Sequence, residues 1–129
     1  MPKNEEWEAA VGKTTYPWGD YFPPKKEDGN YSILADGKDD HAKVGFDGIK
    51  GTAPVGSFRA NALGFVDLGG NVAEWMLDGY DVKDPKAGRR RRGGSWSDAA
   101  GGCTVVPRRF YGPAGSTEVG FRVVFSSVP

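Results

Sequence analysis

The sequence contains one cysteine and one histidine, and that scarcity excludes several kinds of site. A single cysteine cannot form a disulfide within the chain. Without a second histidine or a convincing nucleophile pair, a hydrolytic triad and a three-histidine iron centre are excluded within this chain. No apolar run approaches the roughly 20 residues of a membrane span, and no segment resembles a signal peptide. We therefore expect a soluble chain with no membrane partner.

The chain also lacks net charge, because its 17 basic residues balance 17 acidic ones. Bulk charge therefore predicts neither a nucleic-acid nor a membrane partner. The run Arg89 to Arg92 could contact phosphate, but it is short and follows a polar turn, so nucleic-acid binding is not favoured. His41 lies in an acidic loop, and we expect it to be solvated.

Glycine and aromatic residues are plentiful, with 20 Gly, four Trp, five Tyr and seven Phe among 129 residues. This composition predicts one loop-rich domain with an aromatic core. We expect a short helix from Asn4, as N-cap, to Gly12. Strands are expected at 55–58, 71–77 and, most strongly, 119–128, and a long loop is expected over 27–52.

The stretch "DLGGNVAEWMLDGY" places Asp67 and Glu74 seven residues apart around Gly69 and Gly70. Two glycines permit a tight bend that turns carbonyl groups inward. Calcium prefers hard oxygen ligands from carboxylates and carbonyls. The spacing alone leaves three alternatives for Glu74: a calcium ligand, a solvated acid, or the partner of an arginine.

Six motifs occur in an order that identifies a family: "EEWEAA", "YPWGD", "TAPVGSF", "NALGFVDLGGNVAEW", "RRGGSW" and "GFRVV". In this order they resemble the formylglycine-generating enzyme, or sulfatase-modifying factor, superfamily from about residue 5 to 125. The resemblance implies an α+β fold, an irregular, loop-rich variant of the C-type lectin fold. It also implies that 1–129 is a single domain lacking the family's N-terminal portion, whose strand usually pairs with "GFRVVF".

The resemblance implies two calcium sites, matched residue by residue. One site matches Asn30, Tyr31, Asp47 and Ile49, and the other matches Asp67, Gly70, Val72 and Glu74. The second site would explain a carboxylate among large apolar residues. One departure is Ala73, where the family usually has a second tryptophan.

The copper site of the family's oxidases is matched less well. Those enzymes hold copper with two cysteines five residues apart, and the matching positions here are Asp98 and Cys103. Ser95 matches a family active-site serine. Because Cu(I) prefers soft thiolate ligands, one thiolate and one carboxylate make a poor copper site. We expect no copper, and Cys103 to be a small, half-buried apolar side chain.

These observations favour a calcium-stabilised, non-catalytic binding or scaffold module over an enzyme. Its ligand face is expected within 96–119, a region that diversity-generating retroelements vary in some superfamily members. The residues expected to line this face are Trp96, Ser97, Asp98, Arg108, Phe110 and Tyr111. The ligand would be a protein or a small molecule, and homo-oligomerisation or completion by another chain stays open. The alternative is a copper-dependent oxidase or related oxidoreductase completed by another segment.

Arg122 of "GFR" is expected to form an ion pair or contact carbonyl groups.

Overall fold

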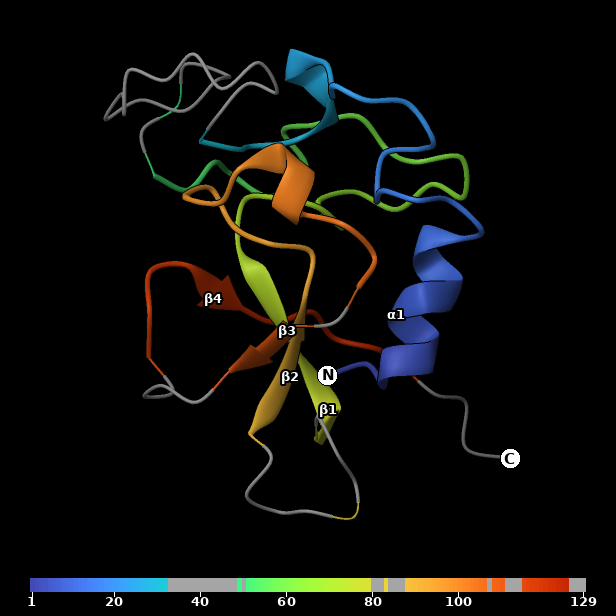
Figure 1. Cartoon of the computed structure of the whole chain (residues 1–129), viewed down its shortest axis with the longest axis vertical. Helices are drawn as coiled ribbons and strands as arrows, with labels where there is room; N and C mark the ends of the chain where they lie inside the picture. The colour runs from blue at the N-terminus through green and yellow to red at the C-terminus, as the bar shows by residue number, and fades with distance from the viewer. Residues whose placement is uncertain are drawn as a thin grey trace.

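The computed structural model describes residues 1–32, 49, 51–79, 83, 88–106, 108–110 and 115–125, the segment 108–110 in its backbone only. Its elements are few and short, separated by long irregular segments (Figure 1). They are α1 (Asn4–Val11), η1 (Lys26–Asp28), β1 (Ala73–Gly79), β2 (Arg89–Arg92), η2 (Ala100–Gly102), β3 (Arg108–Phe110) and β4 (Val119–Gly120). The protein thus has the loop-rich α+β fold that its composition and motifs predicted. None of the described helices is long and apolar enough to cross a membrane.

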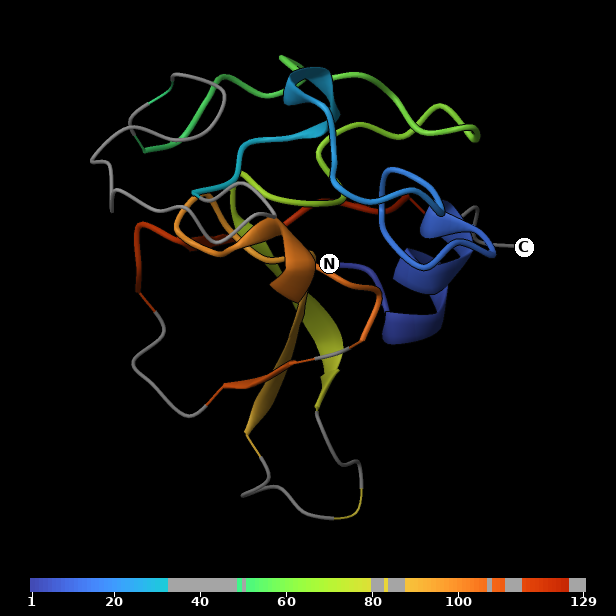
Figure 2. The same cartoon turned by 45° about the horizontal axis from the view of Figure 1, so that its top comes forward.

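The four strands form one sheet in the order β3-β2-β1-β4. Strand β1 pairs antiparallel with β2, and Glu74 lies opposite Arg92. Its other edge pairs in parallel with β4, where Glu74 lies opposite Gly120. Helix α1 lies beside the sheet, and the irregular segments 12–32 and 51–70 gather beyond one end of it (Figures 1 and 2).

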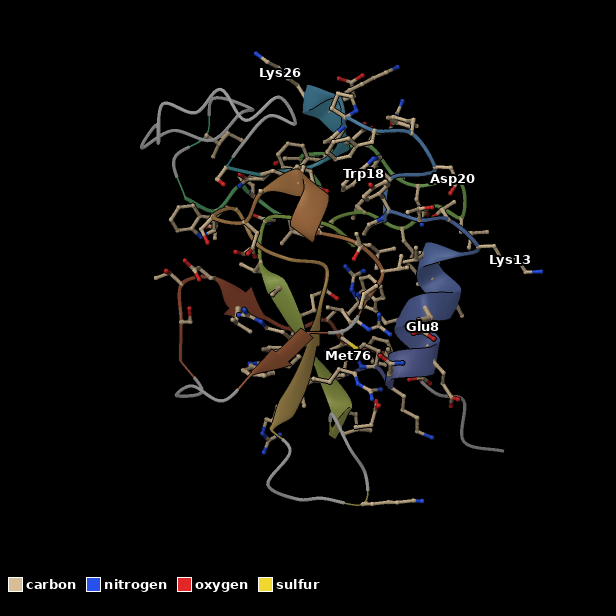
Figure 3. All side chains as sticks on the ribbon, in the orientation of Figure 1. Glu8, Lys13, Trp18, Asp20, Lys26 and Met76 are labelled. Carbon is tan, nitrogen blue, oxygen red and sulfur yellow. The ribbon has the colours of Figure 1, made fainter. Side chains whose placement is uncertain are left out.

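Helix α1 is amphipathic and buries one face against β1. Trp7, Ala10 and Val11 of α1 form a core cluster with Leu68 and Met76. Figure 3 shows Met76 between the strand and the helix. The helix ends before Gly12, whose φ of 86° favours glycine, as the sequence predicted. The N-cap is Lys3 rather than Asn4, and the Asn4 side chain accepts a hydrogen bond from Arg92 instead.

One strand prediction is wrong and another is confirmed only in part. Residues 55–58 form no strand, because Val55 and Gly56 lie in a turn in which Gly56 has a φ of 78° and the Ser57 N–H donates to the Pro54 carbonyl. Of the strand expected at 119–128, the structure shows Val119–Gly120; 121–125 belongs to no strand, and 126–128 lies outside the described residues. A strand requires a neighbouring backbone, and among the described residues none pairs with 121–125. Phe121 and Phe125 are therefore strongly exposed.

Candidate functional site

The two segments matched to calcium sites lie directly against each other. The Asn71 N–H donates to the Asn30 carbonyl at 2.9 Å, in a loop where Asp67, Gly70 and Asn71 all have positive φ. A Cβ added at Gly70 would meet the Asn30 carbonyl oxygen at 2.4 Å, so only glycine permits this approach. The structure therefore brings Asn30 and Tyr31 together with the loop that begins at Asp67.

Asn30 has an amide oxygen that fits a cation. The side chain is fully buried, and its Nδ2 donates to the Gly51 carbonyl at 2.8 Å. Its Oδ1 has no hydrogen-bond partner among the described residues. A buried amide oxygen without a donor is costly unless another positive group meets it. Ile49 is described only in isolation, and Asp47 lies outside the described residues, so the remaining ligands of this site stay predictions.

Asp67 and Glu74 differ in how they meet the requirements of the second site. Asp67 accepts the Gly56 N–H through Oδ2 at 2.6 Å, while its Oδ1 is buried without a partner among the described residues. The Glu74 carboxylate is already occupied: Arg122 Nη2 lies 2.5 Å from Oε1, and Arg122 Nε lies 2.6 Å from Oε2. Trp7 Nε1 also donates to Oε2 at 3.1 Å. The structure thus shows the arginine pair, one of the three alternatives left open by the sequence.

Arg122 makes both kinds of contact expected of it. Besides the Glu74 ion pair, its Nη2 donates to the Val66 and Asp67 carbonyls, each at 3.2 Å. Burial raises the pKa of Glu74, and the Arg122 guanidinium opposes that rise. Gly70 and Val72 lie between Asp67 and Glu74, in the loop that leads into β1.

The positions matched to the copper ligands form a compact turn. Asp98 Oδ2 accepts the Ser95 N–H at 2.8 Å and the Ser95 hydroxyl at 2.9 Å. Cys103 is fully buried rather than half-buried, and its sulfur donates to the Ala99 carbonyl at 3.5 Å. Among the residues that the structure describes, no group of three or more His, Cys, Asp or Glu side chains is placed to hold a metal.

The predicted ligand face is described in part. Trp96 is half-buried; its backbone N–H donates to the Asn71 carbonyl at 2.8 Å, and its Nε1 donates to the Thr117 carbonyl at 3.2 Å. Ser97 is exposed. Arg108 and Phe110 belong to β3, an outer strand of the sheet, while Tyr111 lies outside the described residues. Through Trp96, the face is joined to the same loop that carries Asp67.

Sequence reasoning missed the structural role of Asn71 and of Trp7. Both polar atoms of the Asn71 side chain form hydrogen bonds with the Ala53 backbone. Oδ1 accepts the Ala53 N–H at 2.8 Å, and Nδ2 donates to the Ala53 carbonyl at 3.2 Å. The signal was available, since an asparagine after two glycines often adopts a positive φ and bonds to nearby backbone. Trp7 contacts Glu74 from 67 residues away, for which no local signal exists.

Comparison with known proteins gives the same family as the motifs. The "Sulfatase-modifying factor enzyme 1-like domain" family matches residues 1–127, and the chain therefore belongs to this family. It is 33% identical over 112 residues to the formylglycine-generating enzyme of Mus musculus, covering 74% of this chain and 30% of that enzyme. It is 41% identical over 81 residues to the formylglycine-generating enzyme of Mycobacterium tuberculosis, covering 58% and 25%. The chain thus spans about a third or less of the length of these relatives.

Solved structures share the fold. The structure is similar to Treponema denticola variable protein 1 with a TM-score of 0.71 and 25% identity, over 94% of this chain and 45% of that one. It is similar to CarF with a TM-score of 0.66 and 25% identity over the same shares. The expected fold of the formylglycine-generating-enzyme type is confirmed.

Proposed function

We propose that this protein is a calcium-stabilised, non-catalytic binding or scaffold module of the sulfatase-modifying factor family, with its ligand face within 96–119. The observation that carries the proposal is the use of Asp98 and Cys103 for local structure. The Asp98 carboxylate accepts hydrogen bonds from Ser95 at the start of the turn, and the Cys103 sulfur packs closely against the Gly94 backbone. A buried thiol and a carboxylate already bound to two donors are poor ligands for Cu(I).

The position of the face supports a binding role. Loops held on a rigid base commonly carry recognition, and the segment from Trp96 is fixed to the core loop by the Trp96–Asn71 hydrogen bond. One structural neighbour with the same fold is Treponema denticola variable protein 1. Variation of this region by diversity-generating retroelements in some superfamily members is in keeping with a module that changes its ligand while keeping its base.

Calcium in this proposal belongs at the Asn30 segment. The buried Asn30 Oδ1 is an oxygen aimed at no donor among the described residues, and it lies in the segment whose residues match a family calcium site. Asn30, Tyr31, Asp47 and Ile49 would hold the ion, which would supply charge and rigidity at the base of the face.

An apolar groove supports completion of the module by another polypeptide segment. It runs between α1 and the C-terminal segment, and it is lined by Trp7, Ala10, Phe65, Phe121, Val123 and Val124. Exposed apolar surface of this kind usually marks an interaction site. The formylglycine-generating relatives extend well beyond the matched region, which keeps a copper oxidase completed by another segment as the alternative function.

The experiment that separates the two functions measures copper affinity and turnover. The purified chain should bind Cu(I) weakly in competition with a chromophoric chelator, and it should not convert a sulfatase-type cysteine peptide to the aldehyde. Asp98→Cys supplies the second thiolate and should raise Cu(I) affinity by orders of magnitude, with Ser97→Cys as the matched control. Tight Cu(I) binding or aldehyde formation by the unmodified chain would establish the oxidase instead.

A further inference from the structure

We infer that the guanidinium of Arg122 is the resident cation of the Glu74 site, and that no metal is held there. The second of the two family calcium sites is thereby replaced by an ion pair within the chain. The inference concerns only this site; the ligand face and the calcium proposed at Asn30 do not depend on it.

The geometry is that of a cation seated among oxygens. Arg122 meets both Glu74 oxygens with two different nitrogens, at 2.5 and 2.6 Å. The same Nη2 reaches the Val66 and Asp67 carbonyls. Planar two-point pairing with a carboxylate is the strongest arrangement that an arginine makes. One guanidinium therefore draws together a carboxylate and two carbonyls, the ligand types that calcium would require.

The oxygens left over are too few for a metal. Glu74 is 5% exposed, and besides Arg122 it accepts a hydrogen bond from Trp7. Asp67 retains one side-chain oxygen without a partner among the described residues; with the Gly70 and Val72 carbonyls of the matched set that makes three oxygens, whereas calcium takes six to eight. A metal at Glu74 would have to displace Arg122 and bring a second positive charge within reach of it. The repulsion between the two cations opposes that exchange.

The ion pair also does something that a metal could not do. Arg122 belongs to the segment that leaves β4, so the ion pair holds the C-terminal part of the chain against β1 and, through the hydrogen bond from Trp7 to Glu74, against α1. The cation is therefore present whatever the calcium concentration. This part of the core should be equally stable with calcium and with chelator.

The test compares the wild type with Glu74→Gln and Arg122→Gln, each melted in calcium and in EDTA. Glu74→Gln should lower the melting temperature by about 5 °C or more, and by the same amount in both buffers. Arg122→Gln frees the carboxylate beside Asp67, so calcium should raise the melting temperature of this variant by more than it raises that of the wild type. The double variant Glu74→Gln, Arg122→Gln should lose that gain.

Loss of the wild-type calcium response in Glu74→Gln would overturn the inference. If neither variant folds, terbium luminescence of the wild type decides. Trp7 contacts Glu74, while Trp18 packs on Tyr31 with ring centroids 5.2 Å apart. Terbium emission that is retained in Trp7→Phe supports the inference. If the wild type shows no terbium emission, the inference is also supported, and that result counts only against calcium at Asn30. Emission lost in Trp7→Phe but retained in Trp18→Phe places a metal at Glu74 and refutes the inference.

Discussion

Gly94 lies so close to Cys103 that a Cβ at position 94 would stand 2.3 Å from the cysteine sulfur. Gly94 also has a φ of 72°, which side chains adopt at a cost. Gly94→Ala should therefore lower the free energy of unfolding by about 3 kcal/mol, from overpacking and backbone strain together. Cys103→Ala should cost about 1 kcal/mol alone. Urea unfolding of the double variant should show partial rescue, and strictly additive losses would contradict the contact.

Ser97 and Asp98 are adjacent residues of the predicted ligand face, but they contribute differently to the stability of the fold. Asp98 accepts two hydrogen bonds from Ser95, whereas Ser97 is exposed. Asp98→Ala should cost about 1–2 kcal/mol of stability, because it leaves buried donors unsatisfied. Ser97→Ala should change stability by less than about 0.5 kcal/mol. Equal losses in urea unfolding would show that the face cannot vary independently of its base.

We expect the ionisation of Tyr21 to lower the stability of the folded protein at alkaline pH. Burial and the hydrogen bond to Asp28 raise the pKa of Tyr21 from 10.0 to about 12. The folded state thus holds the phenolic proton more tightly than the unfolded state does. The contribution is full below pH 10 and is lost as the pH rises from 10 towards 12. Tyr21→Phe should flatten the fall in melting temperature between pH 9 and 11 relative to wild type, and an unchanged slope would refute this role.

The elements that the sequence predicted correctly are those with local signals. Acidic residues in the first turn and Gly12 at the end define α1, and the alternation from Val72 onward locates β1 with a shift of two residues at each end. The failures are strands whose partner could not be read locally. Residues 121–125 have the composition of a strand, but β propensity forms no strand without a neighbouring backbone.

The candidate site divides in the same way. The motif left Glu74 as a calcium ligand, a solvated acid or the partner of an arginine, and it could not single out Arg122, which lies 48 residues away. The poor match to a copper site predicted a structural Cys103, but its full burial depends on the close approach of Gly94, which the sequence does not reveal. The contact of Asn30 with the Asp67 loop depends on tertiary packing around Gly70, and no local sequence pattern in either segment predicts it.

Calcium binding at Asn30 gives the last prediction. If Asn30 Oδ1 is a ligand, calcium at a hundredfold excess over its dissociation constant should raise the free energy of unfolding by about 2.7 kcal/mol. Asn30→Ala should abolish most of this rise, whatever it does to stability in EDTA, because the ion loses a buried ligand. The measurement is the difference in unfolding free energy between calcium and EDTA for each variant.

Asn61→Ala is the matched control for that measurement. Asn61 is another asparagine whose side chain bonds to backbone, donating to the Ala10 carbonyl at 2.8 Å, yet it matches no calcium ligand. Its removal should lower stability while leaving the calcium increment intact. Because both variants delete an amide that supports backbone, a general loss of structure would shrink both increments together. A calcium increment that survives in Asn30→Ala, or that is absent from the wild type, would exclude Asn30 as a ligand.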